Sequence, residues 1–169
     1  MRIPINLNKK LSDFAIEKIR EKLQSLTWLD EVYPAVQVGV RENGDTYPQL
    51  YIQAGGQKIL DLTPDTAKKS YIFFEKGKTE VLGEENIYDI SLIWWGQLDA
   101  IDNTRQYDYT TELVAEIVTI LKDLGAYNIT IDYSGAFANY NLHDTRMQFL
   151  MYPYSSFRVD FSIIFSSNC

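Results

Sequence analysis

The last part of the chain has the most regular alternation of apolar and polar residues. Between positions 157 and 165 every second residue is large and apolar, and Arg158, Asp160 and Ser162 stand between them. Successive side chains of a β-strand point to opposite faces, so this pattern predicts a strand with one buried and one solvated face. A second run, 87–95, has apolar residues at both phases, which predicts a strand partly covered on both faces.

Two other segments have the spacing of amphipathic helices. From Asn8 to Leu26, and again from Asp108 to Leu124, apolar residues recur every three or four positions among charged and polar ones. Asn8 and Asp108 are suited to cap the N-termini, and Gly125 stands where glycine commonly ends a helix. Each predicted helix therefore has an apolar stripe that must pack on another element.

Shorter strands are predicted around these helices, separated by turn sequences such as Asn43-Gly44-Asp45 and Thr63-Pro64-Asp65. The predicted strands span 35–41, 49–54, 58–62, 70–75, 126–133 and 146–152. Tight turns join antiparallel neighbours, so the sequence predicts an α+β, two-layer fold: a mostly antiparallel mixed sheet with two amphipathic helices on one face. No repeat, linker or low-complexity tract divides residues 1–169, which are expected to form a single domain.

Composition narrows the class of protein. With 169 residues, 46% of them hydrophobic and 23% charged, the chain can bury an ordinary core without a metal or disulfide. The net charge of −7 disfavours nonspecific binding to nucleic acid. The single cysteine, Cys169, has no partner within the chain, which favours a reducing compartment. No apolar run has the length of a membrane span or the character of a secretion signal, so Asn128-Ile129-Thr130 is interpreted as a chance glycosylation sequon.

The candidate catalytic motifs lack the residues or the spacing that their chemistry requires. Gly77-Lys78-Thr79 resembles the end of a phosphate-binding loop, but that loop needs a glycine where this chain has Ile72, so a polar turn is expected instead. His143 is the only histidine, which excludes a multi-histidine metal site in one subunit. Pairing it with the thiol of Cys169 would place a nucleophile on a frayed terminus, so we expect no such pair. No cofactor or metal is expected.

Acidic residues leave one enzymatic alternative. Asp99 and Asp102 follow Trp94-Trp95, and paired carboxylates beside aromatic rings are typical of glycoside hydrolases. Acids that flank helices and turns are more commonly solvated, so a carboxylate-based hydrolase ranks below the other interpretations.

Aromatic and methionine residues gather in the segment after the second helix. One interpretation is that they complete the core under a long connection. The other is that they form an apolar surface for another subunit, because such residues anchor interfaces. The candidate subunit-interface residues are Phe137, Tyr140, Met147, Phe149, Met151, Tyr152 and Tyr154.

The order of elements resembles a known family. An N-terminal amphipathic helix, antiparallel hairpins, a strand of the type Tyr88–Trp95, a second helix and a strand of the type Phe157–Ile163 also occur together in the tail-terminator and neck proteins of tailed bacteriophages, the group of the lambda-type minor tail protein U. The resemblance covers about residues 9–166 and lies in element order and strand character. The long segment 134–156 departs from a minimal family member.

Membership would imply a non-catalytic virion subunit that assembles with copies of itself into a ring, hexameric at a tail end or twelve-fold nearer the portal. Such a ring caps the tail or joins it to the head-tail connector, contacts other tail, neck or portal proteins, and lets genome DNA pass without specific binding. It is assembled in the cytoplasm of the host bacterium. An acidic protein around that channel would repel the passing DNA. The alternative is a cytosolic, non-catalytic α+β domain that binds a ligand or a protein.

Overall fold

The computed structural model describes residues 2–52, 58–142 and 147–166 and has two mostly antiparallel β-sheets. In chain order its elements are α1 (Ser12–Leu23), β1 (Glu31–Ala35), β2 (Gln37–Val40), β3 (Thr46–Ile52), β4 (Lys58–Asp61), β5 (Ser70–Leu82), β6 (Glu85–Gln97), α2 (Leu98–Ile101), α3 (Thr110–Asp123), β7 (Tyr127–Asp132), the 3₁₀-helix η1 (Gln148–Leu150) and β8 (Tyr154–Ser166). The α+β class predicted from the sequence is confirmed.

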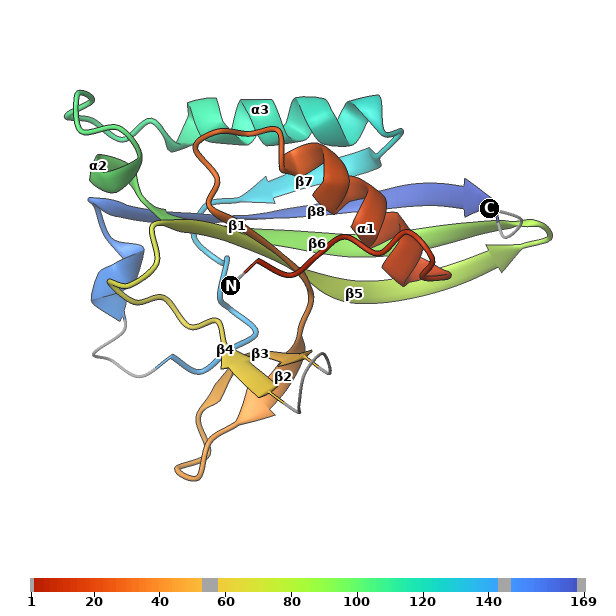
Figure 1. Ribbon diagram of the computed structural model, residues 1–169, viewed down its shortest axis with the longest axis horizontal. Helices are drawn as coiled ribbons and strands as arrows, with labels where there is room; N and C mark the ends of the chain where they lie inside the picture. Colours follow the sequence, from red (N-terminus) through yellow and green to blue (C-terminus); the bar gives the residue numbers. More distant parts are fainter. Residues whose placement is uncertain (1, 53–57, 143–146, 167–169) are drawn as a thin grey trace.

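The larger sheet has five strands in the order β1-β5-β6-β8-β7 (Figure 1). β5 and β6 form a long hairpin, and β8 pairs with β6 from Glu85 opposite Ser166 to Gln97 opposite Tyr154. β7 is antiparallel to β8, whereas β1 is parallel to β5. Parallel neighbours cannot be joined by a tight turn, and here the chain between β1 and β5 forms the smaller sheet before it returns.

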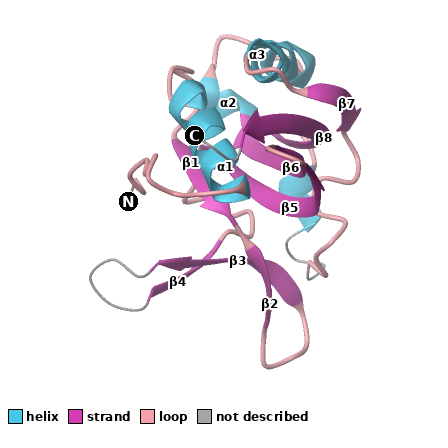
Figure 2. Cartoon of the chain, turned by 90° about the vertical axis from the view of Figure 1, so that its right-hand side faces the viewer, coloured by secondary structure: helices cyan, strands magenta, loops and turns pink. Residues whose placement is uncertain are grey.

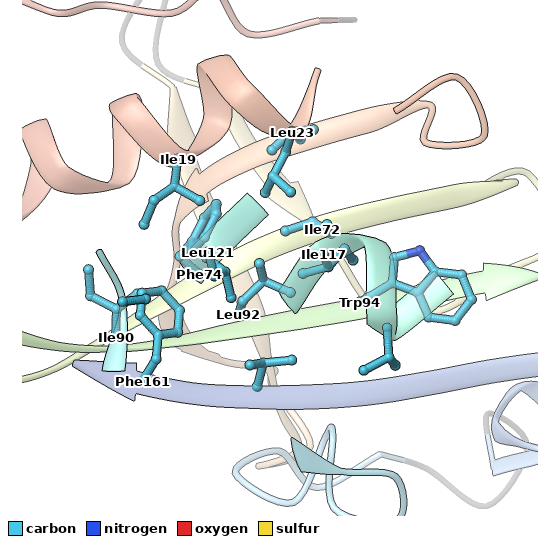
Figure 3. Packing of buried hydrophobic residues seen from close by; sticks show 14 of the residues in the cluster. Ile19, Leu23, Ile72, Phe74, Ile90, Leu92, Trp94, Ile117, Leu121 and Phe161 are labelled. Carbon is cyan, nitrogen blue, oxygen red and sulfur yellow. The ribbon is translucent and has the colours of Figure 1, made fainter. Parts of the chain in front are cut away.

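One face of the larger sheet carries α1 and α3, as predicted (Figure 1). Figure 3 shows Ile19 of α1 and Ile117 of α3 among sheet residues such as Phe74 and Leu92. Trp94 is fully buried on this face and stacks on Phe157, with their ring centroids 5.0 Å apart. These contacts form the main core.

The opposite face of the larger sheet is only partly exposed, which corrects the prediction of a solvated face for the C-terminal strand. A second core on this side includes Tyr71, Phe73 and Trp95 of β5 and β6, and residues from the 134–154 connection and from β3 cover them. Arg158, predicted on the solvated face, has a side chain only 17% exposed. Alternation thus showed that this face is polar near Arg158, but the connection that covers it could not be seen in the pattern.

The smaller sheet, β2-β3-β4, projects from the body (Figure 2). The sequence predicted one strand over 35–41, but the chain divides at Val36, whose N–H donates to the carbonyl of Phe74, 2.8 Å away. Before this residue, β1 pairs with β5; after it, β2 pairs with β3. The sequence therefore encodes two sheets here, where one was expected.

The first helix is shorter than predicted. It begins at Ser12, and Asn8 does not cap it; Leu11 occupies the N-cap position with a φ of 58° and no side-chain cap. The residues before it cross α1 instead, because Glu17 accepts a hydrogen bond from the N–H of Asn6. Arg20, also buried, donates to the carbonyl of Ile3. We call residues 2–10 the N-terminal strap.

Two other segments differ from prediction. The strand expected at 70–75 continues to Leu82, so residues 76–82 are part of a long hairpin, and Gly77 lies at a bulge in it. The strand expected at 146–152 contains η1, which packs beside β8. The predicted end of the second helix is confirmed: Gly125 has a φ of 87° and donates to the carbonyl of Lys122.

Candidate subunit-interface surfaces

The 134–154 connection places its aromatic and methionine residues in two environments. Phe137 and Tyr140 are 4% and 7% exposed, and Phe149 and Tyr154 pack against the same second core. Trp95 stacks on Tyr154 with ring centroids 5.7 Å apart and donates its indole N–H to the carbonyl of Phe149. These four residues therefore have their apolar surface in use within the chain.

The other three candidate interface residues lie on the outside. Met147 is 49% exposed, Met151 69% and Tyr152 56%. They remain available for contact with another subunit, and they follow each other closely along the connection. The two interpretations of this cluster, core and interface, thus apply to different members of it.

A charged group fixes the connection to the sheet. Glu75 of β5 accepts hydrogen bonds from the hydroxyl of Tyr140 at 2.7 Å and from the side-chain amide of Asn139 at 2.9 Å. It also pairs with Arg158 of β8 at 2.8 Å, and Arg158 donates in turn to Asp160 at 2.9 Å. The carboxylate of Glu75 therefore ties two strands of the larger sheet to the connection that covers them.

The electrostatics of this group follow from burial and neighbouring charge. Burial raises the pKa of the Tyr140 hydroxyl, and the hydrogen bond to Glu75 raises it further. Burial lowers the pKa of Arg158, but the charges of Glu75 and Asp160 outweigh that effect, so the pKa of Arg158 is raised overall. Both groups stay in one protonation state at neutral pH, which suits a structural role rather than proton transfer.

The larger sheet has two open edges. β1 pairs with β5 only as far as Phe74, and no strand among the described residues pairs with β5 beyond that point on the same side. Val81 and Leu82, near the tip of this segment, are 70% and 52% exposed. At the other edge of the sheet, β7 contributes Ile131, which is 39% exposed, and Tyr133 follows it.

The smaller sheet adds a third apolar surface and a groove. Val38 and Val40 of β2 are more than half exposed. A groove of about 620 Å³ separates this sheet from the open part of β5, and Glu75, Lys76 and Val38 are among its lining residues. It lies where β1 ends and the unpaired edge of β5 begins.

The acidic candidates from the sequence are not brought together with the tryptophans. Trp94 and Trp95 are buried on opposite faces of the sheet, so they do not line a common cleft beside Asp99. Asp102 accepts hydrogen bonds from the N–H and hydroxyl of Thr104, which lower its pKa. These contacts explain Asp102 as a turn residue.

Other predicted residues are placed as follows. Asp108 accepts from the N–H of Thr110, the first residue of α3, at 2.9 Å, but Tyr109 occupies the N-cap position and has no side-chain cap, so the predicted N-cap at Asp108 is wrong by one residue. Asp132 accepts from the N–H groups of Ser134 and Gly135 and has a lowered pKa for that reason. Gly77-Lys78-Thr79 lies within β5 and not in the polar turn that was expected. His143 and Cys169 lie outside the described residues.

Sequence reasoning missed the open edges, the projecting sheet and the Glu75 group. One signal for the open edges was present: Val81 and Leu82 before Gly83-Glu84 form an apolar pair next to a turn sequence, in a stretch for which no strand was predicted. Glu75 gave no such signal, because its partners lie 64 to 83 residues away in sequence.

Within the described part of the chain, no group of three or more histidine, cysteine, aspartate or glutamate side chains is arranged to hold a metal ion. None of the helices described is both long and apolar enough to cross a membrane. No protein-family model matches the sequence, and no curated protein matches it either.

Proposed function

We propose that this chain is a non-catalytic structural subunit of a tailed-bacteriophage virion, a tail terminator or neck protein that assembles with copies of itself into a ring. The ring caps the tail or joins it to the head-tail connector, contacts other tail, neck or portal proteins, and lets genome DNA pass through. The subunit is assembled in the bacterial cytoplasm and needs no cofactor.

The observation that carries this proposal is the position of exposed apolar side chains at both edges of one sheet. A closed ring needs a heterologous contact, in which one patch on a subunit meets a different patch on the next. Val81 and Leu82 lie at the β5 edge and Ile131 and Tyr133 at the β7 edge, so the subunit has two different patches on opposite sides. The α+β layout, with α1 and α3 on one face, agrees with the element order of the family.

The charge of the chain supports the same proposal. A net charge of −7 disfavours tight, nonspecific binding to DNA, as a subunit around a passing genome requires. In this proposal the protein acts by docking alone.

The test is the oligomeric state of the purified chain. Size-exclusion chromatography with light scattering, followed by negative-stain electron microscopy, should show ring-shaped oligomers whose population rises with protein concentration. Where a tail-tube protein is encoded beside this gene, its addition should increase that population. A chain that stays monomeric at its highest soluble concentration and with the tube protein present would overturn the proposal.

A pair of substitutions separates assembly from folding. Met151→Asp with Tyr152→Asp changes two exposed side chains, so the variant should keep its circular dichroism and its unfolding transition. If the exposed part of the 134–154 connection contacts another subunit or the tube, the variant should assemble less. Phe137→Asp is the matched contrast, because Phe137 is buried and its replacement should unfold the subunit.

The groove beside β5 favours one alternative. A cavity of about 620 Å³ with both charged and apolar walls is large enough for a ligand or a peptide segment. A domain that binds such a partner would remain monomeric and would show saturable binding that Val38→Arg, in the groove wall, abolishes. Ring formation without a bound partner favours the virion subunit.

A further inference from the structure

The two open edges of the larger sheet are complementary to each other, and this suggests how copies of the chain join. We infer that β7 of one subunit pairs, antiparallel, with residues 78–81 of β5 in the next subunit, so that the sheet continues from copy to copy. This inference rests on the proposed ring function and names the contact that builds the ring.

Strand direction is the first argument. β6 is antiparallel to β5, β8 to β6, and β7 to β8, so β7 runs opposite to β5. In a ring all subunits have the same orientation along the ring, and a neighbour's β5 beside β7 therefore has the antiparallel direction without any rotation of the subunit. The open edge of β5 also projects past α1, where a neighbour can reach it (Figure 1).

The faces of the two strands are the second argument. Ile131 lies opposite Val159, whose side chain is in the helix-covered core, so Ile131 points to the helix side of the sheet. Thr79 lies opposite Tyr88 of the same core, and it points to the helix side too. Residues that face each other across a strand pair share a face, so Thr79 and Ile131 can stand opposite each other.

Charge then selects the register. With Thr79 opposite the neighbour's Ile131, Lys78 stands opposite Asp132, which gives an ion pair, and Val81 stands opposite Ile129. A shift of two residues keeps the faces but brings Glu80 opposite Asp132, and two like charges in that position repel. A shift of two residues the other way brings Lys78 opposite Thr130 and moves Asp132 to Lys76, on the far side of the bulge between Lys76 and Thr79. The first register is therefore the one that pairs Asp132 with a lysine of the regular strand segment.

The groove receives the residue that follows the strand. In this register the neighbour's Tyr133 comes opposite Gly77, beside Lys76 at the wall of the groove. Its side chain, 49% exposed in the isolated subunit, is of the type that anchors interfaces. The bulge between Lys76 and Thr79 separates the paired segment from the part of β5 that β1 covers. An open edge strand that lacks a bulge or a charged residue tends to pair with any other strand. The bulge and Lys78 therefore also limit the pairing of this β5 edge to the neighbour's β7.

Engineered cysteines test the register. In a Cys169→Ser background, Thr79→Cys and Ile131→Cys are made in separate proteins that differ in mass by a tag, and the two are mixed under mild oxidation. A disulfide should form between the two proteins and in neither alone, and a chain with both substitutions should give a ladder that ends at the ring size. The matched control is Thr79→Cys mixed with Thr130→Cys, one residue further on the opposite face, which should give no disulfide.

The outcomes separate this contact from the ring itself. Disulfides within Thr79→Cys alone or Ile131→Cys alone would show edge pairing between like strands and would overturn the inference. Rings in micrographs without the 79–131 disulfide would overturn it while the proposed function stands. Absence of any oligomer, with the tube protein present, would overturn both the proposed contact and the proposed function.

Charge reversal gives a second, independent measurement. Lys78→Glu should raise the concentration for half-assembly about fivefold, because it brings a like charge opposite Asp132. Lys58→Glu in β4 makes the same change of charge on an exposed lysine away from both edges and should leave assembly unchanged. Equal effects of the two variants would assign the change to net charge and would contradict the register.

Discussion

The first helix contains two ion pairs with the same spacing in sequence but different burial, and they make a controlled experiment. Glu17 and Arg20 are 1% and 0% exposed, and Lys18 and Glu21 are 37% and 46% exposed. We compare Arg20→Met with Lys18→Met. Each substitution removes one positive charge and keeps most of the aliphatic side chain.

The expected magnitudes follow from what each substitution leaves behind. Arg20→Met removes the buried cation beside Glu17 and the donors to the carbonyls of Val32 and Ile3, which lie 2.9 and 2.8 Å from its nitrogens. Glu17 keeps its bonds to Lys9 and to the N–H of Asn6 but loses its buried ion pair, and the two carbonyls lose these donors, which together costs about 3–5 kcal/mol of the free energy of unfolding. Lys18→Met removes an exposed pair 3.8 Å long and should cost at most about 0.5 kcal/mol.

Urea unfolding followed by circular dichroism measures both free energies, provided that the slope with denaturant is the same for all three proteins. Limited proteolysis gives a second readout, because Arg20 holds the N-terminal strap through Ile3, and only Arg20→Met should expose residues 2–10 to cleavage. Free energies within about 1 kcal/mol of each other would refute the reasoning, since they would mean that spacing and not burial sets the contribution of these pairs.

Three further predictions concern glycines and a tyrosine. Gly96→Ala should cost about 1–3 kcal/mol of the free energy of unfolding, measured in urea, because its Cβ would lie 2.4 Å from the fully buried ring of Trp94. Gly125→Ala should cost only about 1 kcal/mol by the same assay, because its φ of 87° is strained for alanine but no atom stands within 4 Å. Above about pH 10 the free energy of unfolding should fall as pH rises, because the raised pKa of Tyr140, caused by burial and then by Glu75, keeps a proton in the folded state that the unfolded chain releases. Unfolding at pH 8 to 11 should show a smaller slope for Tyr140→Phe than for the wild type, and an unchanged slope would contradict this cause.

Local signals in the sequence were sufficient for the elements of the main core. The alternation from Phe157 to Phe165 predicted β8, and the stripe of α3 placed Leu113, Ile117 and Leu121 in the core, where they are buried. These patterns are reliable because each repeats the period of one element over many residues. Gly125 ended α3 as predicted because few other residues adopt its backbone conformation without strain.

The predicted start of α1 was wrong because the residues before Ser12 do not extend the helix but pack across it. Leu11 fits the helical period, but it is 65% exposed and precedes the helix. Asn6 and Lys9 bond to Glu17, and these contacts hold the strap across the helix. A pattern of period 3.6 cannot show that residues before the helix return to pack on it, since the contacts join Glu17 to the side chain of Lys9 and the backbone N–H of Asn6, which are 8 and 11 positions away.

The sequence could predict only part of the candidate subunit interface. Aromatic and methionine residues are common in cores and in interfaces alike, so composition could not separate Phe137 from Met151. Their exposure differs because Phe137 packs on Phe73, with centroids 5.9 Å apart, whereas Met151 lies at the end of η1. The open edges were harder still, because an unpaired strand has the same sequence pattern as a paired one.

The position of Glu75 explains why the sheet has one covered half and one open half. Toward β1, the side chains of β5 on the second face are Tyr71 and Phe73, which need an apolar cover and receive it from the connection. At Glu75 the face becomes polar, and Arg158 and Tyr140 satisfy its carboxylate, so the cover can end there without leaving a buried charge unpaired. Beyond that point the hairpin needs no cover from its own chain. Its edge is open from the point where β1 leaves β5 at Phe74, next to the residue that closes the second core.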